Sequence, residues 1–372
     1  MSKYLDEIIG NQKVRLIFES MMKQSNIPHA LLFTGSEGVG KENAAISFAK
    51  AINTFKSNSA DEKKIVTSIQ KFSEPYIKYI LPLPRGKNET DQNDPYEKFT
   101  QDEMDLIKTE FEKKSENPFY RIEIPKANII KINSIRDVKK FLSLNYDDVK
   151  YRIVIISRAH LMNEEAQNAL LKNLEEPPAG VIFILCTAYP EKLRETIRSR
   201  CWKIHFQPLD NDDLVYVLTK YFKVDENLAR EVTPFSEGST QGAMLLLEND
   251  FEELREKTIR ILRNSFAKRY HSALTEFEDA LSDSDQLKIK LLIKMLLIWL
   301  NDFQKFRLKK LDNIFYTKHL ETLEKFNSKF PDIEISSVTN NLDKISSYLK
   351  NNINLNLAVS NIIFQLSSLV TK

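Results

Sequence analysis

The octapeptide GSEGVGKE has the spacing of a phosphate-binding loop but ends on an unusual side chain. In such a loop Gly, four residues, Gly and Lys precede a Ser or Thr whose hydroxyl binds Mg²⁺, while backbone N–H groups and the lysine hold the phosphates. Gly35, Gly40 and Lys41 occupy these positions and Gly38 lies inside the loop, but Glu42 places a carboxylate at the magnesium position. Gly35, Gly38, Gly40 and Lys41 are therefore candidate nucleotide-binding residues of a degenerate loop, for which we expect weak or no binding.

The segments around this loop predict a strand before it and a helix after it. Residues 29–35 (HALLFTG) form an apolar run that leads into the glycines, and residues 43–52 (NAAISFAKAI) are rich in alanine. Further apolar runs at residues 151–157 and 181–187 suit strands that are covered on both faces. Between them, residues 163–178 predict a helix that Asn163 caps. This alternation of strands and helices predicts an α/β fold with a doubly wound parallel sheet.

Two other regions differ from this pattern. Residues 56–120 are rich in charge, Pro and Asn and predict one helix near residues 101–114, so we interpret them as an insertion into the α/β domain. The run EFEKK within that helix is typical of a solvated face. From about Leu209 onward only amphipathic helical patterns remain, including one at residues 355–370, which predicts an all-α C-terminal half.

Composition excludes several classes of protein. The 54 basic and 52 acidic residues give a net charge of only +2, which does not favour a dedicated nucleic-acid binder. Two cysteines, Cys186 and Cys201, supply neither a disulfide framework nor a four-cysteine zinc site, and residues 56–120 contain no cysteine or histidine, so no metal site is predicted. No signal sequence or membrane span is apparent, which favours a cytoplasmic location.

Two long stretches carry a resemblance to a known family. NEEAQNALLKNLEEPP at residues 163–178, and FILCTAYPEKLRETIRSRCWKIHF at residues 183–206, resemble motifs of the clamp-loader AAA+ proteins, most closely of the delta-prime type in the bacterial DNA polymerase III clamp loader. The resemblance implies an AAA+ α/β domain at residues 1–207, a helical lid domain at 208–250 and a helical collar domain at 251–372. It also implies a pentameric ring with motor ATPase and delta-type subunits, through which the sliding clamp and primed DNA are reached.

The residues that an AAA+ ATPase needs can be compared with this chain. Active relatives carry an acidic pair after the third strand, where this chain has Ser157 and Arg158, and a sensor arginine in the lid, where it has Gln241. Together with Glu42, these residues remove a metal ligand, a base and a sensor. We therefore expect no ATP hydrolysis and no bound cofactor.

Ser199 and Arg200 belong to the family's Ser-Arg-Cys motif, whose arginine enters the nucleotide site of a neighbouring subunit. The resemblance thus marks both as candidate catalytic residues that act in trans, since such an arginine stabilises charge on a transferring phosphoryl group. Cys201 is expected to be a packed residue.

The predicted function is that of a non-catalytic stator subunit of the clamp loader. Two alternatives remain open at the level of the sequence. One is an active AAA+ motor, either a clamp-loader ATPase or a related branch-migration helicase, which acidic residues after the third strand would favour. The other is a free-standing DNA-binding protein, which a clustered basic stripe would favour.

Overall fold

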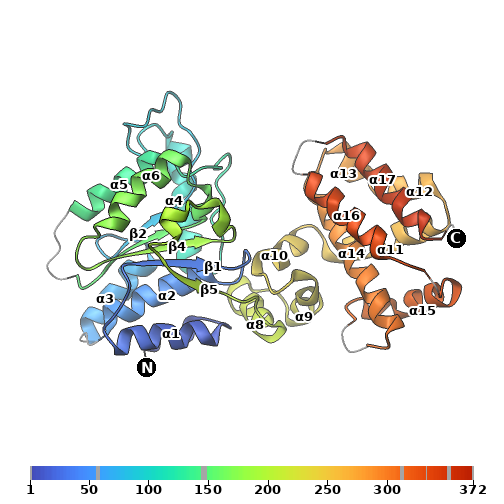
Figure 1. The fold of residues 1–372 in the computed structure, drawn as a ribbon, viewed down its shortest axis with the longest axis horizontal. Helices are drawn as coiled ribbons and strands as arrows, with labels where there is room; N and C mark the ends of the chain where they lie inside the picture. Colours follow the sequence, from blue (N-terminus) through green and yellow to red (C-terminus); the bar gives the residue numbers. More distant parts are fainter. Residues whose placement is uncertain are drawn as a thin grey trace. The chain divides into compact units, whose positions relative to one another are not determined.

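A five-stranded parallel sheet lies at the centre of the N-terminal part of the chain (Figure 1). In the computed structural model, which describes residues 2–55, 59–143, 149–310, 314–331, 333–349 and 353–370, the strand order is β2-β3-β4-β1-β5. The strands are β1 (Ala30–Thr34), β2 (Ile77–Ile80), β3 (Arg152–Ile156), β4 (Val181–Thr187) and β5 (Trp202–His205). β1 lies between β4 and β5, so the loop that follows it leaves the interior of the sheet.

Both faces of the sheet are covered, and β1 and β4 at its centre are buried at every position. Leu31 and Phe33 of β1 pack with helices α1 to α3, whereas Ala30 and Leu32 pack with α5 and α6 on the opposite face (Figure 1). Successive side chains of a strand point to opposite faces, so a strand that is buried at every position requires a helix layer on each side. The predicted doubly wound α/β fold is confirmed.

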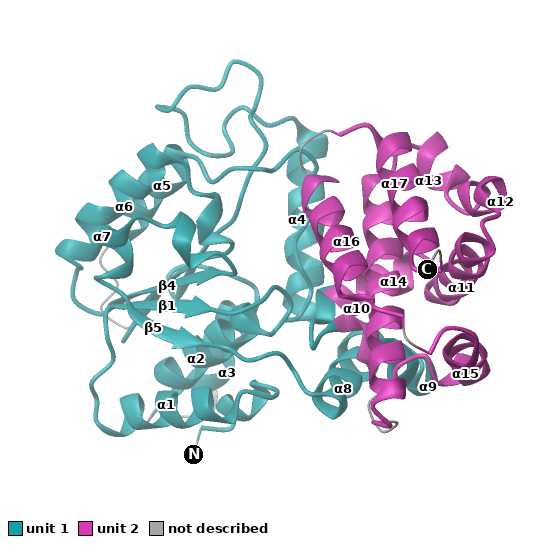
Figure 2. Ribbon diagram, turned by 45° about the vertical axis from the view of Figure 1, so that its right-hand side comes forward, with its two compact units in different colours: residues 1–233, 237–241 teal, residues 234–236, 242–372 magenta. Residues whose placement is uncertain are grey.

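The chain divides into two units, which Figure 2 colours separately. Unit 1 comprises residues 1–233 and 237–241, and unit 2 comprises residues 234–236 and 242–372. The helices of unit 1 are α1 (Gln12–Lys23), α2 (Lys41–Thr54), α3 (Ser59–Gln70), α4 (Gln101–Glu116), α5 (Ile132–Ser143), α6 (Glu164–Glu175), α7 (Glu195–Arg198), α8 (Asn211–Phe222) and α9 (Glu226–Val232). Short 3₁₀ turns lie at Leu5–Glu7, Ala159–Leu161 and Pro190–Lys192.

The interpretation of residues 56–120 as an insertion is wrong over much of its length. β2 pairs in parallel with β3 and forms an edge of the central sheet, and Ile65 and Ile69 of α3 belong to the core that α2 also contributes to. Residues 56–58 lie outside the described residues. The helix predicted near residues 101–114 is confirmed as α4, but EFEKK is not a solvated face, because Glu110 and Lys114 are only 3% and 2% exposed.

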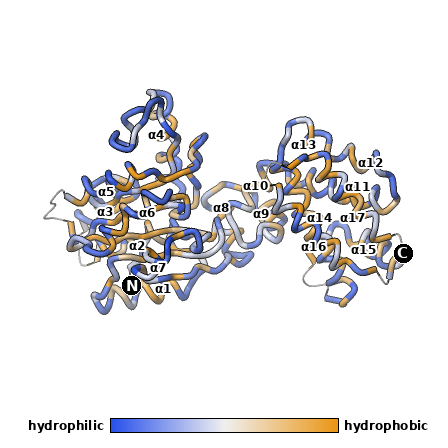
Figure 3. Tube along the Cα trace, turned by 45° about the horizontal axis from the view of Figure 1, so that its top comes forward, coloured by the Kyte–Doolittle hydropathy of each residue, from blue (hydrophilic) through white to orange (hydrophobic). Residues whose placement is uncertain are grey.

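Unit 2 contains helices and connecting turns but no strand among its described residues. Its helices are α11 (Phe251–Phe266), α12 (Tyr270–Thr275), α13 (Glu278–Ser282), α14 (Gln286–Arg307), α15 (Leu320–Lys329), α16 (Ser336–Tyr348) and α17 (Leu355–Ser368), with 3₁₀ turns at Thr233–Ser236 and Thr317–His319, while α10 (Thr240–Glu248) begins in unit 1 and continues into unit 2. Hydrophobic and hydrophilic segments alternate along these helices (Figure 3). The predicted all-α C-terminal region is confirmed, and Trp299 and Phe303 of α14 lie in its core.

A buried carboxylate connects α14 to the segment that precedes α15. Asp302 is fully buried and accepts hydrogen bonds from the backbone N–H groups of Phe315 (2.7 Å) and Tyr316 (2.8 Å). Burial raises the pKa of the Asp302 carboxyl despite these hydrogen bonds. The carboxylate therefore satisfies two donors that would otherwise be buried without a partner.

The unit boundary lies at residue 242, nine residues before the predicted start of the collar at 251. Residues 208–233 and 237–241 of the predicted lid belong to the same unit as the sheet. The division into three domains at 207/208 and 250/251 stays a prediction, and its last two residues, 371–372, lie outside the described residues.

Candidate functional site

The glycine loop lies between β1 and α2, as its position in the sequence predicts. Gly35, Gly38 and Gly40 have φ values of 133°, 74° and 86°, which side chains with a Cβ rarely adopt. A Cβ at Gly35 would lie 2.4 Å from the carbonyl oxygen of Phe206. The loop therefore has a backbone conformation with positive φ at three positions, each of which is occupied by glycine.

Lys41 does not extend away from this loop but folds back onto it. Its Nζ donates to the carbonyl oxygens of Gly35 (2.8 Å) and Ser36 (2.5 Å). The side chain is buried, and burial lowers the pKa of the ammonium group. The lysine that would contact phosphates in a working loop is thus committed to the loop's own carbonyl oxygens.

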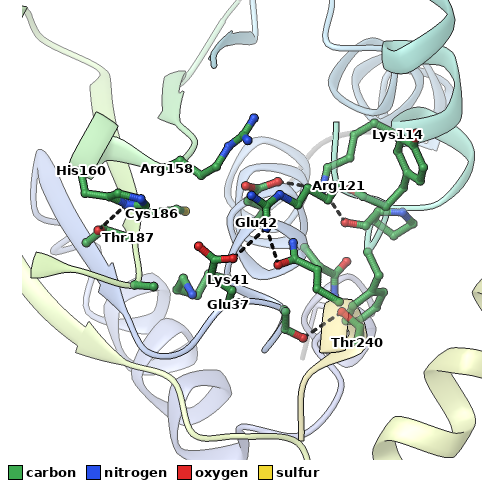
Figure 4. Close-up of a pocket in the computed structure, with 18 residues that line it drawn as sticks. Glu37, Lys41, Glu42, Lys114, Arg121, Arg158, His160, Cys186, Thr187 and Thr240 are labelled. Atoms are coloured by element: carbon green, nitrogen blue, oxygen red, sulfur yellow. Dashed lines mark hydrogen bonds and ion pairs between the residues drawn. The ribbon is translucent and has the colours of Figure 1, made fainter. Parts of the chain in front are cut away.

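Glu42, at the position where a phosphate-binding loop carries its metal-binding hydroxyl, is partly buried and lies in the same pocket as Lys114 (Figure 4). Its carboxylate accepts hydrogen bonds from Lys114 Nζ at 2.8 Å, from the Tyr79 hydroxyl at 2.5 Å and from the Ser157 hydroxyl. Burial by itself would raise the pKa of this carboxyl, but the charge of Lys114 and the three hydrogen bonds outweigh burial and hold the pKa at about 2. Glu42 is therefore ionised and already paired with a cation.

The Lys114 ammonium group is surrounded by oxygen atoms. Besides Glu42, it donates to the carbonyl oxygens of Pro118 (3.0 Å) and Tyr120 (2.6 Å). One carboxylate and two carbonyls are the kind of oxygen ligands that Mg²⁺ or Ca²⁺ binds in proteins. A tethered ammonium group from α4 thus supplies the positive charge beside the residue at the magnesium position.

Arg158 and Gln241, which differ from the residues of an active AAA+ ATPase, also line this pocket, as does His160. Arg158 donates from its guanidinium to the carbonyl oxygen of Ile122 at 3.1 Å, and burial lowers its pKa. His160 contacts the hydroxyl of Thr187 at 3.0 Å, and burial lowers the histidine pKa to about 4. Gln241 accepts a hydrogen bond from Arg121 at 2.9 Å. None of these three side chains is a carboxylate that could hold a metal ion.

A Mg²⁺-nucleotide does not fit the residues that are present. The pocket between the loop, α4 and β4 has a volume of about 60 Å³, whereas ligand pockets commonly measure about 300–1,000 Å³. The lysine of the loop, the residue at the magnesium position and the residue at the sensor position all have partners within the chain. Among the described residues, no cluster of His, Cys, Asp and Glu could hold a metal ion.

Ser199 and Arg200 lie elsewhere, in the turn that follows α7. The Arg200 side chain is 37% exposed, pairs with Glu175 of α6 at 2.8 Å and donates to the carbonyl oxygen of Thr196 at 3.0 Å. Ser199 is exposed and donates to the same carbonyl oxygen at 3.2 Å. Cys201 is buried, and burial raises its pKa to about 12.

The structure thus brings together the loop residues Gly38, Gly40 and Lys41 with Glu42 and Gln241, while Ser199 and Arg200 do not line the pocket. Lys114, Tyr79 and Arg121 were not predicted as site residues. A carboxylate at the position of a metal-binding hydroxyl was a signal that a cation must lie nearby, but the sequence does not say which of the 54 basic residues provides it.

The first strand of a parallel sheet leads through a glycine loop into a helix, and a helical segment reaches the same loop. This arrangement defines the chain as an α/β module of the AAA+ type. The chain belongs to the family described as "DNA polymerase III, delta subunit", whose model matches residues 10–210.

Individual relatives are similar over about two thirds of the chain. The DNA polymerase III subunit tau of Bacillus subtilis is 26% identical over 248 residues, which cover 65% of this chain and 37% of that protein. The Replication factor C small subunit of Staphylothermus marinus is 27% identical and covers 66% of this chain and 58% of that protein. Among solved structures, a DNA polymerase III gamma subunit-related protein of Thermotoga maritima is 15% identical, with a TM-score of 0.41 and coverage of 95% and 99%.

The chain spans less than two thirds of the length of the first curated relatives, namely 37%, 26% and 57%. In the part of the chain that is described, no helix is long and apolar enough to cross a membrane.

Proposed function

We propose that this chain is a non-catalytic stator subunit of the sliding-clamp loader of DNA polymerase III, and that it acts in DNA replication. Its family, and relatives named as tau and gamma subunits of that polymerase, support a place in the clamp loader. The partners would be motor ATPase and delta-type subunits in a pentameric ring, with the sliding clamp and primed DNA reached through the complex. A cytoplasmic location follows from this role.

The observation that carries the non-catalytic part is the Glu42–Lys114 pair. A cation from the chain itself neutralises the carboxylate that stands in place of the metal-binding hydroxyl. Arg158 after β3 and Gln241 in the predicted lid leave no acidic pair and no sensor arginine.

The purified chain should neither bind Mg²⁺-ATP nor hydrolyse it. The measurement is a calorimetric titration with ATP, with and without Mg²⁺, alongside an assay of phosphate release. Micromolar binding that requires Mg²⁺ would contradict the non-catalytic assignment and would favour the alternative of an active AAA+ motor.

The part of the proposal that concerns a neighbouring subunit rests on Arg200. Its guanidinium lies on the surface, and its ion pair with Glu175 joins two side chains that are 37% and 48% exposed, so the pair is weak. An arginine held in this way can exchange its partner for a phosphate of an adjoining subunit. Ser199 would support the turn that presents it.

Arg200→Ala should leave folding and assembly intact while lowering the ATP turnover of the reconstituted complex stimulated by clamp and DNA. At the site that faces this subunit the loss should be on the order of 10³-fold, whereas total turnover should fall only in part because other interfaces keep their own arginines. Arg200→Lys should rescue poorly, since an ammonium group lacks the planar fork of guanidinium.

Arg198→Ala serves as the matched control, because Arg198 is an exposed arginine two residues away. Gel filtration verifies that each variant assembles. Unchanged turnover in the Arg200→Ala complex would reduce Arg200 to an ordinary surface residue.

A further inference from the structure

Residues 117–121, which directly follow α4, cross the face of the glycine loop. Phe119 is buried, and a Cβ added to Gly40 would lie 3.2 Å from its ring. The carbonyl oxygens of Pro118 and Tyr120 accept hydrogen bonds from Lys114, which fixes this segment to the end of α4. We call residues 117–121 the bridging segment.

The bridging segment also contacts the part of unit 1 that corresponds to the predicted lid, residues 208–233 and 237–241, here called the lid segment. Asn117 donates from Nδ2 to the carbonyl oxygen of Tyr221 in α8 at 3.1 Å. The rings of Phe119 and Tyr221 lie 5.1 Å apart between centroids. The bridging segment is thus in contact with the loop on one side and with α8 on the other.

Arg121 joins the loop and the lid segment through a single side chain. Its Nη1 donates to Glu37 of the loop at 2.7 Å and to the side-chain oxygen of Gln241 at 2.9 Å (Figure 4). In an AAA+ ATPase an anionic phosphate lies between cationic groups of the loop and the lid. Here the polarity is inverted, because a guanidinium lies between two acceptors.

The glycine loop and the lid segment also contact each other directly, at what we call the junction. The backbone N–H and the hydroxyl of Thr240 both donate to the carbonyl oxygen of Gly38, at 3.0 and 2.9 Å. Gly38 has a φ of 74°, and a Cβ at this position would lie 2.8 Å from the backbone nitrogen of Gln241, so the approach requires glycine. The glycine kept at the centre of the loop therefore serves a contact within the protein.

We propose that the bridging segment takes the place of a bound nucleotide as the connection between the glycine loop and the lid segment. The lid segment is held closed on the loop by Asn117, Phe119 and Arg121, so its position does not depend on ATP. This proposal concerns the isolated chain and does not rest on the action of Arg200 in trans.

The test is hydrogen–deuterium exchange of the full-length chain, followed at the amides of residues 237–241 and of α8. The Thr240 amide reports the junction directly because it donates to Gly38. Wild-type exchange at these amides should be unchanged by millimolar Mg²⁺-ATP. Arg121→Ala should accelerate it on the order of tenfold, since it removes two charge-assisted hydrogen bonds.

Two further variants complete the comparison. Gly38→Ala should accelerate the same amides by steric opening and is the positive control, whereas Lys108→Ala, at an exposed position of α4, should change nothing. The amides of β1 and β4 verify that each variant keeps its fold.

Two results would overturn the proposal. One is an Arg121→Ala variant whose amides at residues 237–241 exchange at the wild-type rate, while the same amides exchange faster in Gly38→Ala. The other is a tenfold or greater slowing of wild-type exchange by Mg²⁺-ATP, which would mean that nucleotide still closes the lid segment.

Discussion

At the scale of residues, one substitution in the loop is matched by changes far away in the sequence. Glu42 lies at the position where a phosphate-binding loop carries a metal-binding hydroxyl, and its partner Lys114 lies 72 residues further along the chain. A largely buried carboxylate without a counter-charge is costly, so Glu42, whose side chain is 23% exposed, requires a nearby cation and donors such as Tyr79 and Ser157.

Removing either partner alone should destabilise unit 1 strongly. Glu42→Gln leaves the Lys114 ammonium buried without a charge partner, at a cost of about 3–5 kcal/mol at pH 7, while the double variant Glu42→Gln/Lys114→Met should recover much of this. Urea unfolding of the four proteins forms a double-mutant cycle. Additive losses would contradict coupling between the two side chains.

The pH dependence of the same pair has a definite sign. The pKa of Glu42 is about 2 in the folded chain and 4.5 for the free side chain of the unfolded chain, so its contribution is present above about pH 4.5 and disappears as pH falls toward 2. It amounts to on the order of 3 kcal/mol at neutral pH. The free energy of unfolding of the wild type, measured in urea at a series of pH values, should fall by this amount on acidification. The double variant Glu42→Gln/Lys114→Met should lack this part of the decrease.

At the scale of elements, strongly patterned segments were predictable and short edge strands were not. The cap of α6 was correctly predicted, since Asn163 accepts a hydrogen bond from the Ala166 N–H. β2 was missed because it has four residues and lies within a polar stretch, and β5 was missed because Trp202, Lys203 and His205 are exposed. Sequence periodicity reports burial, so it fails where an edge strand is short or solvated.

The candidate site was predictable only where its residues form a local sequence pattern. The glycine loop and its departures at Glu42, Arg158 and Gln241 are local patterns, and they were identified from spacing. The bridging contact of Arg121 depends on tertiary folding of residues that lie between α4 and α5, and no local pattern marks it.

The connection between α14 and the segment before α15 should depend on Asp302. Asp302→Ala leaves the buried N–H groups of Phe315 and Tyr316 without an acceptor and should destabilise unit 2 by about 2–4 kcal/mol. Thermal unfolding followed by the fluorescence of Trp299 measures this, because Trp299 lies on α14. Asp283→Ala, at an exposed position before α14, is the matched control, and an equal effect of both variants would contradict the assignment.

At the scale of the whole molecule, the two units are not joined at a single point. The chain enters unit 2 for residues 234–236, returns to unit 1 for residues 237–241 and enters unit 2 again at residue 242. Within unit 2, the ring of Phe235 packs against Phe251 and Tyr316, with centroid distances of 5.1 and 5.2 Å.

A chain cut after residue 250, at the predicted start of the collar, should therefore expose an apolar ring. Phe235 is 1% exposed in the intact chain, and its aromatic partners Phe251, Phe315 and Tyr316 all lie beyond residue 250. The truncated chain should bind an apolar dye and aggregate, and Phe235→Ser in the same chain should reduce both. Equal dye binding with and without Phe235→Ser would show that this ring is not the exposed surface.

The interleaved boundary has a consequence for how such chains can diversify. A genetic exchange with one breakpoint near residue 242 would give the hybrid a helical unit from one parent but residues 234–236 from the other. Phe235 would then meet a foreign aromatic cluster in place of Phe251 and Tyr316. Working hybrids between relatives should consequently carry their breakpoints before residue 234, so that Phe235 is inherited together with Phe251 and Tyr316.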